Sequence, residues 1–234
     1  MMRSLLGGVL AGWAMLVPPV LAADHPVVVE LFTSQGCASC PPADGFFEQL
    51  AARDDVLALS LHVDYWDYIG WEDTFGSPAY TARQRGYAAA GGRKMVYTPQ
   101  MIVNGTDHVV GSRYHDVTDV IDKHLGAQDN GISVALRREG GQVHFEARSV
   151  RPRRMPLLVQ FVSYLPEATV EIARGENAGR TITYTNVVTD LVEVAEWDTL
   201  DPLTLDIDWP EDAPLAVLLQ YPDYGTIEAV ARLR

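Results

Sequence analysis

Two cysteines, Cys37 and Cys40, constrain this chain more than any other feature of its sequence. They are the only cysteines among its 234 residues, and they stand between a β-branched apolar run at 27–32 and a helical pattern at 43–53. Two intervening residues allow one turn of chain to bring the sulfur atoms within bonding distance. The pair therefore belongs to the connection between a strand and a helix.

Three interpretations of the pair are open from the residues alone. As a working thiol pair, Cys37 is the nucleophile and Cys40 the resolving thiol, because a helix N-terminus lowers the pKa of a cysteine placed there. As a metal clamp, the two thiolates join His62 in a soft-ligand site suited to copper(I). As a structural staple, the disulfide is inert in a non-catalytic binding protein, although so short a loop gains little stability from closure. Pro41 and Pro42 move the expected helix start to Cys40.

Charge and composition limit the classes of partner. The formal net charge of −13 argues against a nucleic-acid partner, because phosphates would be repelled over most of the surface. The hydrophobic content of 47% is enough for a substantial core. For a working thiol pair we expect protein thiols, disulfides or a redox partner protein as partners. The sequence indicates no cofactor and does not determine the oligomeric state.

Residues 1–23 have the pattern of a secretory signal peptide. Arg3 precedes the apolar run "LLGGVLAGWAMLVPPVLAA", and cleavage after Ala22 or Ala23 fits its small-residue end. No later segment approaches the roughly eighteen apolar residues of a membrane span. We therefore expect a secreted, periplasmic protein with no stable membrane span after cleavage, in a compartment where disulfides persist.

The pattern of secondary structure changes near residue 130. Residues 24–128 follow the order β-α-β, a helical insertion at about 65–94, and β-β-α, with a hairpin turn at Asn104-Gly105. Ser77-Pro78 is a suitable cap and first-turn pair for the helix of the insertion. Residues 129–234 contain seven or so short alternating runs between turns. The sequence thus predicts an α/β domain followed by an all-β, sandwich-like domain.

A proline far from the cysteines in the sequence completes a pattern that is typical of a known superfamily. In "YTPQMIVNG", Thr98-Pro99 stands directly before a strand that runs into the hairpin. With the CxxC and the element order, residues 27 to about 126 resemble the thioredoxin superfamily. The resemblance implies a thioredoxin-like fold, a cis Thr98–Pro99 bond packed against the CxxC, and a backbone there that pairs with substrate.

A finer signature points to one family. The segments "ELFTSQGCASCPPAD", "HVDYWDYIGW" and "RGENAGRT" are similar to a family of secreted bacterial proteins known as domain of unknown function 1223. This resemblance covers nearly the whole mature chain, and it implies a thioredoxin-like fold without an assigned substrate. In "RGENAGRT", Glu176 and Asn177 either face the first domain or only close a hairpin.

Five further residues are candidates to line the site. Strand alternation places His62 and Asp64 on one face, and the carboxyl end of a parallel strand opens beside the CxxC loop. Trp66 and Asp67 then line the entrance with Asp64. Glu30 lies near the position where thioredoxins carry a buried acid that serves proton transfer. The alternatives are a hydrogen-bonded interior histidine for His62 and lid packing for Trp66.

Overall fold

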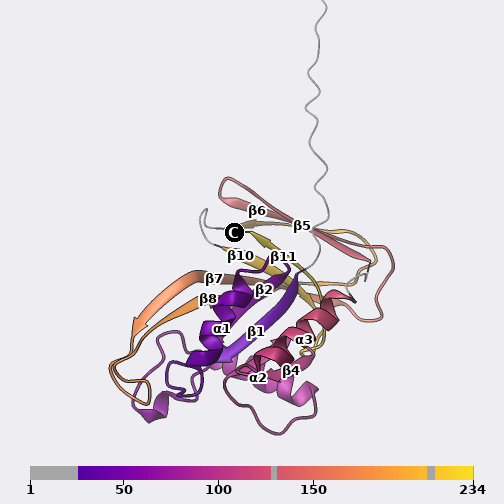
Figure 1. The fold of residues 1–234 in the computed structure, drawn as a ribbon. Coiled ribbons are helices and arrows are strands. Elements are labelled where there is room, and N and C mark those ends of the chain that lie inside the picture. Colours follow the sequence, from indigo (N-terminus) through magenta and orange to yellow (C-terminus); the bar gives the residue numbers. More distant parts are fainter. Residues whose placement is uncertain (1–25, 128–130, 210–213, 234) are drawn as a thin grey trace, which may run out of the picture.

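The computed structural model describes residues 26–127, 131–209 and 214–233 (Figure 1). Its strands form one eight-stranded sheet, ordered β11-β10-β7-β8-β2-β1-β3-β4, and one three-stranded sheet, ordered β5-β6-β9. In chain order the elements are β1 (Val27–Thr33), α1 (Pro41–Ala51), β2 (Val56–His62), the 3₁₀ turn η1 (Asp67–Ile69), α2 (Pro78–Ala90), β3 (Gln100–Val103), β4 (Asp107–Val110), α3 (Tyr114–Leu125), β5 (Ile132–Glu139), β6 (Gln142–Ser149), β7 (Leu157–Glu171), β8 (Thr181–Trp197), β9 (Leu203–Asp208), β10 (Leu215–Gln220) and β11 (Ile227–Leu233).

Strand β1 lies at the centre of the first half, and all seven of its residues are buried. It pairs in parallel with β2 and antiparallel with β3. Alternate side chains enter two different cores. Val29 and Leu31 pack with α1 and α3, while Val28 and Phe32 pack with α2. Figure 1 shows α1 and α3 on the near face of the sheet. The two faces of β1 therefore position two separate sets of buried side chains.

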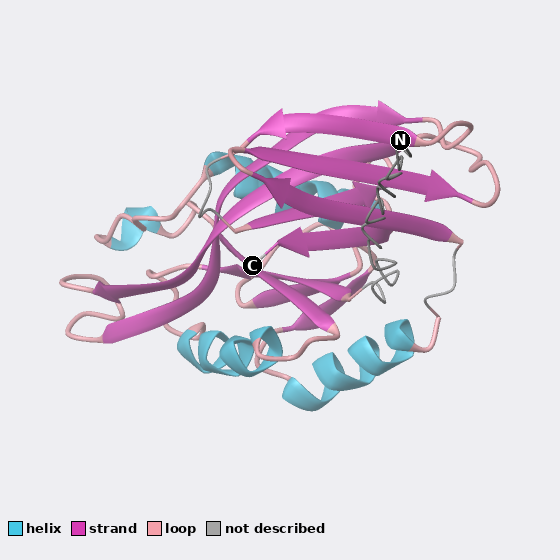
Figure 2. Cartoon of the chain, turned by 90° about the horizontal axis from the view of Figure 1, so that it is seen from above, coloured by secondary structure: helices cyan, strands magenta, loops and turns pink. Residues whose placement is uncertain are grey.

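The second half of the chain extends the same sheet. Strand β8 joins β2 in parallel through one register pair, Ser60 with Val187, and β7 and β10 continue outward from β8. The three-stranded sheet packs on β7, β10 and β11 around a third apolar core. Figure 2 shows the strands from above, with helices beside them. The segments that the sequence analysis treats as two domains are thus joined by a continuous hydrogen-bonded sheet.

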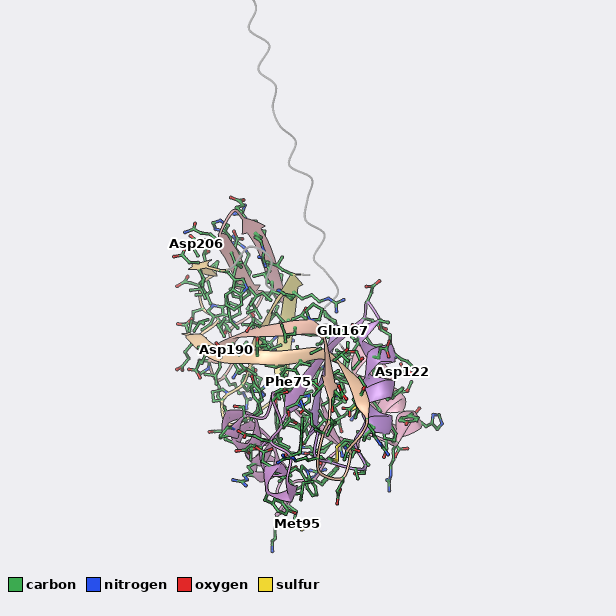
Figure 3. All side chains as sticks on the ribbon, turned by 90° about the vertical axis from the view of Figure 1, so that its left-hand side faces the viewer. Phe75, Met95, Asp122, Glu167, Asp190 and Asp206 are labelled. Atoms are coloured by element: carbon green, nitrogen blue, oxygen red, sulfur yellow. A yellow bond between two sulfur atoms is a disulfide. The ribbon has the colours of Figure 1, made fainter. Side chains whose placement is uncertain are left out.

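Strand β7 is longer than the sequence pattern predicts. The sequence shows two separate alternating runs, at 157–165 and 168–174, and the structure joins most of them in one strand, Leu157–Glu171, despite Pro166 between them. Strand β8 matches a single alternating run at 181–197. Proline is tolerated there because the pairing of β7 with β10 ends at Ser163, so the missing N–H faces an unpaired edge. Figure 3 shows Glu167 and Asp190 along this pair of strands. Strand β9 has no counterpart in the sequence analysis, because its alternation is short and strongly acidic.

Several local expectations are confirmed. Cys40 is the N-cap of α1, as its two prolines predict, and the Ser77 side chain accepts the Ala79 N–H at the start of α2. The Asn104-Gly105 hairpin has φ angles of 44° and 74° at its two turn residues, as a tight primed turn requires. The Thr98–Pro99 bond is cis. The predicted signal peptide lies outside the described residues, and none of the described helices has the length and apolarity of a membrane span.

Candidate functional site

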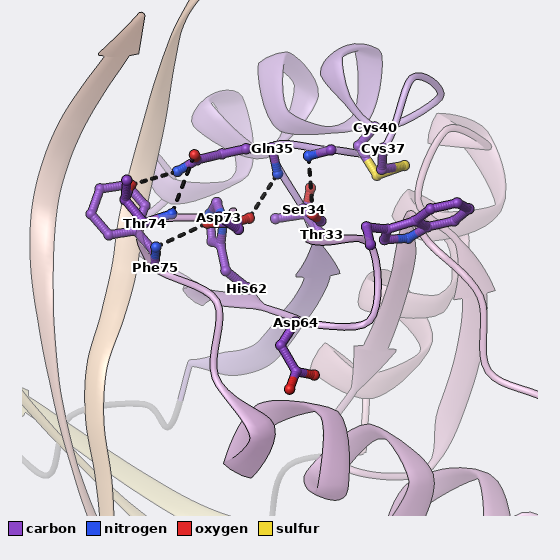
Figure 4. Close-up of polar contacts among 12 residues, drawn as sticks. Thr33, Ser34, Gln35, Cys37, Cys40, His62, Asp64, Asp73, Thr74 and Phe75 are labelled. Atoms are coloured by element: carbon purple, nitrogen blue, oxygen red, sulfur yellow. Dashed lines mark hydrogen bonds and ion pairs between the residues drawn. A yellow bond between two sulfur atoms is a disulfide. The ribbon is translucent and has the colours of Figure 1, made fainter. Parts of the chain in front are cut away.

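Cys37 and Cys40 form a disulfide immediately before α1 (Figure 4). The turn between them is closed by the Cys40 N–H, which donates to the Cys37 carbonyl at 3.2 Å. Cys37 is 1% exposed and Cys40 is 0% exposed, whereas the two residues between them, Ala38 and Ser39, are exposed. A partner therefore meets the Ala38-Ser39 backbone before it reaches either sulfur atom.

The first turn of α1 does not offer a free N–H to the disulfide. Pro41 and Pro42 have no N–H, and those of Ala43 and Asp44 donate to the Cys40 carbonyl at 2.8 and 3.0 Å. A hydroxyl group does lie near the disulfide, because Oγ of Ser39 is 3.4 Å from Sγ of Cys37. A thiolate at Cys37 would therefore depend on this hydroxyl and on the long-range helix dipole.

Trp66 closes one side of the site. Its indole Nε1 donates to Thr98 Oγ1 at 2.8 Å, and a Cβ added to Gly36 would lie 3.2 Å from the Trp66 Cβ. The Ser39 hydroxyl donates to the Thr98 carbonyl at 3.4 Å. Trp66 therefore joins the loop before Cys37 to the Thr98–Pro99 loop, and any side chain larger than glycine at position 36 would displace it.

The other side is held by residues far away in the sequence. The Gln35 N–H donates to Asp73 Oδ2 at 2.7 Å (Figure 4). The Gln35 side-chain oxygen accepts the Trp71 indole N–H at 2.7 Å. The buried Asn177, in the loop between β7 and β8, donates its Nδ2 to the carbonyls of Gln35 and Cys37 at 2.9 and 3.0 Å. Asn177 thus faces the first half of the chain, which is one of the two alternatives drawn from "RGENAGRT". Gln35 is a residue of this site that the sequence pattern did not predict.

A buried carboxyl group lies in the first turn of α1, four residues after Cys40. Thr33 Oγ1 donates to Asp44 Oδ1 at 2.8 Å, and the second oxygen, Oδ2, has no hydrogen-bond partner among the described residues. Burial raises the pKa of Asp44 to about 7, although the Thr33 hydrogen bond and the charge of His62 act in the opposite direction. The sequence analysis missed this residue, whose only signal is an acid in the second position after Pro42.

His62 lies beside Asp44 and is fully buried. Its Nδ1 is 2.8 Å from Asp73 Oδ2, and its ring stands edge to face with Tyr184 of β8 at a centroid distance of 4.7 Å. Burial pushes the pKa of Asp73 upward, but the hydrogen bond and charge of His62 outweigh it, so the pKa of Asp73 lies below its usual value. The structure thus gives His62 a hydrogen-bonded interior position.

The remaining predicted residues occupy other places. Glu30 is on the opposite face of β1, where Arg83 Nε and the Tyr87 hydroxyl donate to it at 2.6 and 2.5 Å. Asp64 accepts the Thr81 hydroxyl at 2.5 Å and points toward α2 (Figure 4). Asp67 Oδ1 accepts the Asp73 N–H at 3.1 Å. Of these three, only Asp67 is joined to the network around the disulfide.

The copper(I) alternative requires two thiolates, whereas this structure holds the cysteines as a disulfide. Cys37 and Cys40 are bonded to each other, and Nδ1 of His62 is bonded to Asp73. Within residues 26–127, 131–209 and 214–233, no group of three or more histidine, cysteine, aspartate or glutamate side chains is arranged to hold a metal ion.

Comparisons with known proteins place the chain in a family but assign no activity. No curated protein matches it. A crystal structure of a protein from Agrobacterium tumefaciens has 35% identity over 88% of this chain and 93% of its own, with a TM-score of 0.77. A second solved structure, of an endonuclease/exonuclease/phosphatase from Beutenbergia cavernae, has 18% identity, covers 44% of this chain and 23% of its own at a TM-score of 0.22, and carries no argument. A family model matches residues 28–220, and the chain therefore belongs to the family described as "protein of unknown function (DUF1223)".

Proposed function

We propose that this protein carries out thiol–disulfide exchange through Cys37 and Cys40, outside the cytoplasm and on a thioredoxin-like arrangement of its first half. The observation that carries the proposal is the disulfide at the start of α1, with the exposed Ser39 linking it to the Thr98 carbonyl. The parallel β1-α1-β2 unit, the β3-β4 hairpin and α3 support the thioredoxin-like arrangement. The substrate class is a protein dithiol, or in the reverse direction a protein disulfide.

The exchange balances as two successive displacements. A substrate thiolate attacks Sγ of Cys37, the Cys37–Cys40 bond breaks, and Cys40 leaves as a thiolate that takes up a proton. A second substrate thiolate then attacks the substrate sulfur of the mixed disulfide and releases Cys37. The substrate is oxidised to a disulfide, and the cysteine pair is reduced to a dithiol. In the reverse direction, Cys37 is the attacking thiolate and Cys40 resolves the mixed disulfide.

Asp44 is suited to exchange the proton of this reaction. It lies within one helical turn of Cys40, and its carboxyl group is buried with a pKa raised to about 7. A group with this pKa is half protonated near neutral pH, so it gives up or accepts a proton at little cost. The sequence suggested Glu30 for this role. In the structure, Glu30 lies on the other face of β1, where its carboxylate accepts hydrogen bonds from Arg83 and Tyr87.

A second candidate function is a non-catalytic binding protein with an inert disulfide. It is favoured by one observation, the near-complete burial of both cysteines. Exchange requires that a partner displace the Ala38-Ser39 backbone or the Trp66 side chain far enough to reach Cys37. The two functions therefore differ in whether the bond is accessible to small thiols in the folded protein.

Redox equilibration of the full chain distinguishes these functions. We expect the Cys37–Cys40 bond to equilibrate with a glutathione buffer at a reduction potential between about −120 and −270 mV. The fraction of reduced protein is measured by alkylating the free thiols and determining the protein mass by mass spectrometry. Cys37→Ser should abolish exchange, and Cys40→Ser should trap a mixed disulfide at Cys37. Ser133→Ala is the matched control, because it removes an exposed serine hydroxyl in β5, outside the site, and keeps both sulfur atoms. A potential below about −300 mV would identify an inert disulfide.

A further inference from the structure

Three neighbouring buried side chains near the first turn of α1 each carry one polar atom without a partner among the described residues. Asp44 Oδ2, His62 Nε2 and the Tyr184 hydroxyl each have no hydrogen-bond partner among the described residues. Their side chains belong to residues that are 5%, 0% and 1% exposed. Buried polar groups are almost always hydrogen-bonded, and leaving one unpaired costs free energy. Three such atoms in one cluster therefore indicate an additional ligand.

The three side chains come from different elements and are linked by neighbouring contacts. Thr33 and His62 are partners across the parallel β1–β2 pair, and Thr33 holds the Asp44 carboxyl from α1. The rings of His62 and Tyr184 stand 4.7 Å apart, centre to centre. The charge of His62 acts on the pKa of Asp44, and the charge of Asp44 acts on the pKa of Tyr184. Elements α1, β2 and β8 thus bring the three side chains into one buried cluster.

The hydrogen-bonding capacities of these atoms specify the ligand. Asp73 is a carboxylate that only accepts, so Nδ1 of His62 carries a proton and donates to it. Nε2 of His62 accepts when the ring is neutral and donates when the ring is charged. Asp44 accepts when ionised and donates when protonated, and the Tyr184 hydroxyl does either. The ligand must therefore be able both to donate and to accept. Water has this capacity, and buried water molecules usually have two to four polar partners.

We propose that a buried water molecule is bound by Asp44 Oδ2, His62 Nε2 and the Tyr184 hydroxyl. With His62 neutral and Asp44 ionised, the water donates to Asp44 and His62 and accepts from Tyr184. With His62 neutral and Asp44 protonated, the water accepts from Asp44 and donates to His62 and Tyr184. Each of the three atoms then has at least one hydrogen bond in either protonation state of Asp44.

The water completes a hydrogen-bonded path below the disulfide. From Asp44 in α1 it runs through the water to His62 and Asp73, and Asp73 accepts the Gln35 N–H at 2.7 Å in the loop before Cys37. The charged groups that act on Asp44 are His62 from β2 and Asp73 from the loop before α2. From β8, the titratable group that interacts with Asp44 is the Tyr184 hydroxyl. This inference does not depend on thiol exchange, because it concerns the oxidised protein alone.

A high-resolution crystal structure of the full chain tests the water directly. We expect density for one oxygen within about 3.2 Å of all three atoms. In Tyr184→Phe the water should be absent. The matched control is Tyr80→Phe, which removes a buried hydroxyl that donates to Val188 of the same strand at 3.2 Å and leaves the cluster intact. An empty cluster, direct bonds among the three atoms, or a water that persists in Tyr184→Phe would overturn the proposal.

Carbon-13 NMR of the Asp44 carboxyl supplies a readout in solution. A bound water stabilises the ionised carboxylate, so its loss in Tyr184→Phe should raise the pKa of Asp44 by about one unit above that of the parent chain. The Tyr80→Phe variant should leave that pKa unchanged. Equal values in the parent and Tyr184→Phe proteins would contradict a water shared by these residues.

Discussion

The two faces of β1 carry buried charged clusters that differ in one respect. On the α2 face, Glu30, Arg83, Tyr87 and Gln220 bond to one another, and none of their polar atoms lacks a partner. On the α1 face, the cluster of Asp44, His62, Asp73 and Tyr184 retains three unpaired atoms. A satisfied network holds a fold rigidly, whereas unpaired buried atoms indicate a ligand or a changing protonation state. The comparison separates a structural cluster from a candidate functional one.

The largest expected effect comes from breaking the satisfied cluster. Arg83→Ala leaves the buried Glu30 charge without its 2.6 Å partner, so we expect a loss of about 3–5 kcal/mol in the free energy of unfolding. Urea denaturation measures it. Lys123→Ala is the control, because its ion pair with Asp107 is largely exposed and is worth less than about 1 kcal/mol. A loss for Arg83→Ala as small as that for Lys123→Ala would show that the α2 cluster is not structural.

The cluster with unpaired atoms should make the free energy of unfolding depend on pH, through the titration of Asp44. The pKa of Asp44 in the folded protein, about 7, lies above its value of about 4 in an unfolded chain. The folded state therefore holds the proton more tightly, and stability falls as the pH rises from about 4 to about 7. Asp44→Asn removes this loss, so we expect it to be more stable than the parent protein by about 2–4 kcal/mol at pH 8 and nearly equal at pH 4.

Denaturation curves at a series of pH values measure this difference. Asp73→Asn provides the opposite control, because its carboxyl has a lowered pKa and contributes stability that is lost as the pH falls. Parallel pH profiles for the parent protein and Asp44→Asn would show that Asp44 does not titrate near neutral pH.

The smallest effect compares one hydroxyl from each cluster. The Tyr87 hydroxyl donates to Glu30 and accepts from Arg83 and Gln220, so Tyr87→Phe leaves charged partners unpaired and should cost about 1–3 kcal/mol. Tyr184→Phe removes a hydroxyl with no protein partner, so it should cost at most about 1 kcal/mol. Thermal or urea unfolding measures both. Equal costs would remove the distinction between the two clusters.

Much of the local structure was predictable because its signals are local. Pro41 and Pro42 place the start of α1, the Asn104-Gly105 dipeptide places a hairpin, and Ser77-Pro78 places the start of α2. The arrangement around the disulfide was less predictable. Asn177 bonds to Cys37 across 140 positions, and only the pairing of β7 with β8 brings it there. Asp44 carries no pattern that distinguishes it from an exposed acid in the first turn of a helix.

The sequence by itself determined the CxxC pair, its place between a strand and a helix, the helix start at Cys40 and the family. Each depends on residues close together in the chain or on a recognisable motif. Only the tertiary structure decided which acid lies beneath the disulfide. Glu30 and Thr33 are three positions apart on one strand, and the alternation of side chains sends Glu30 to Arg83 and Thr33 to Asp44. Which helix covers each face is set by long-range packing, and no short segment of sequence encodes it.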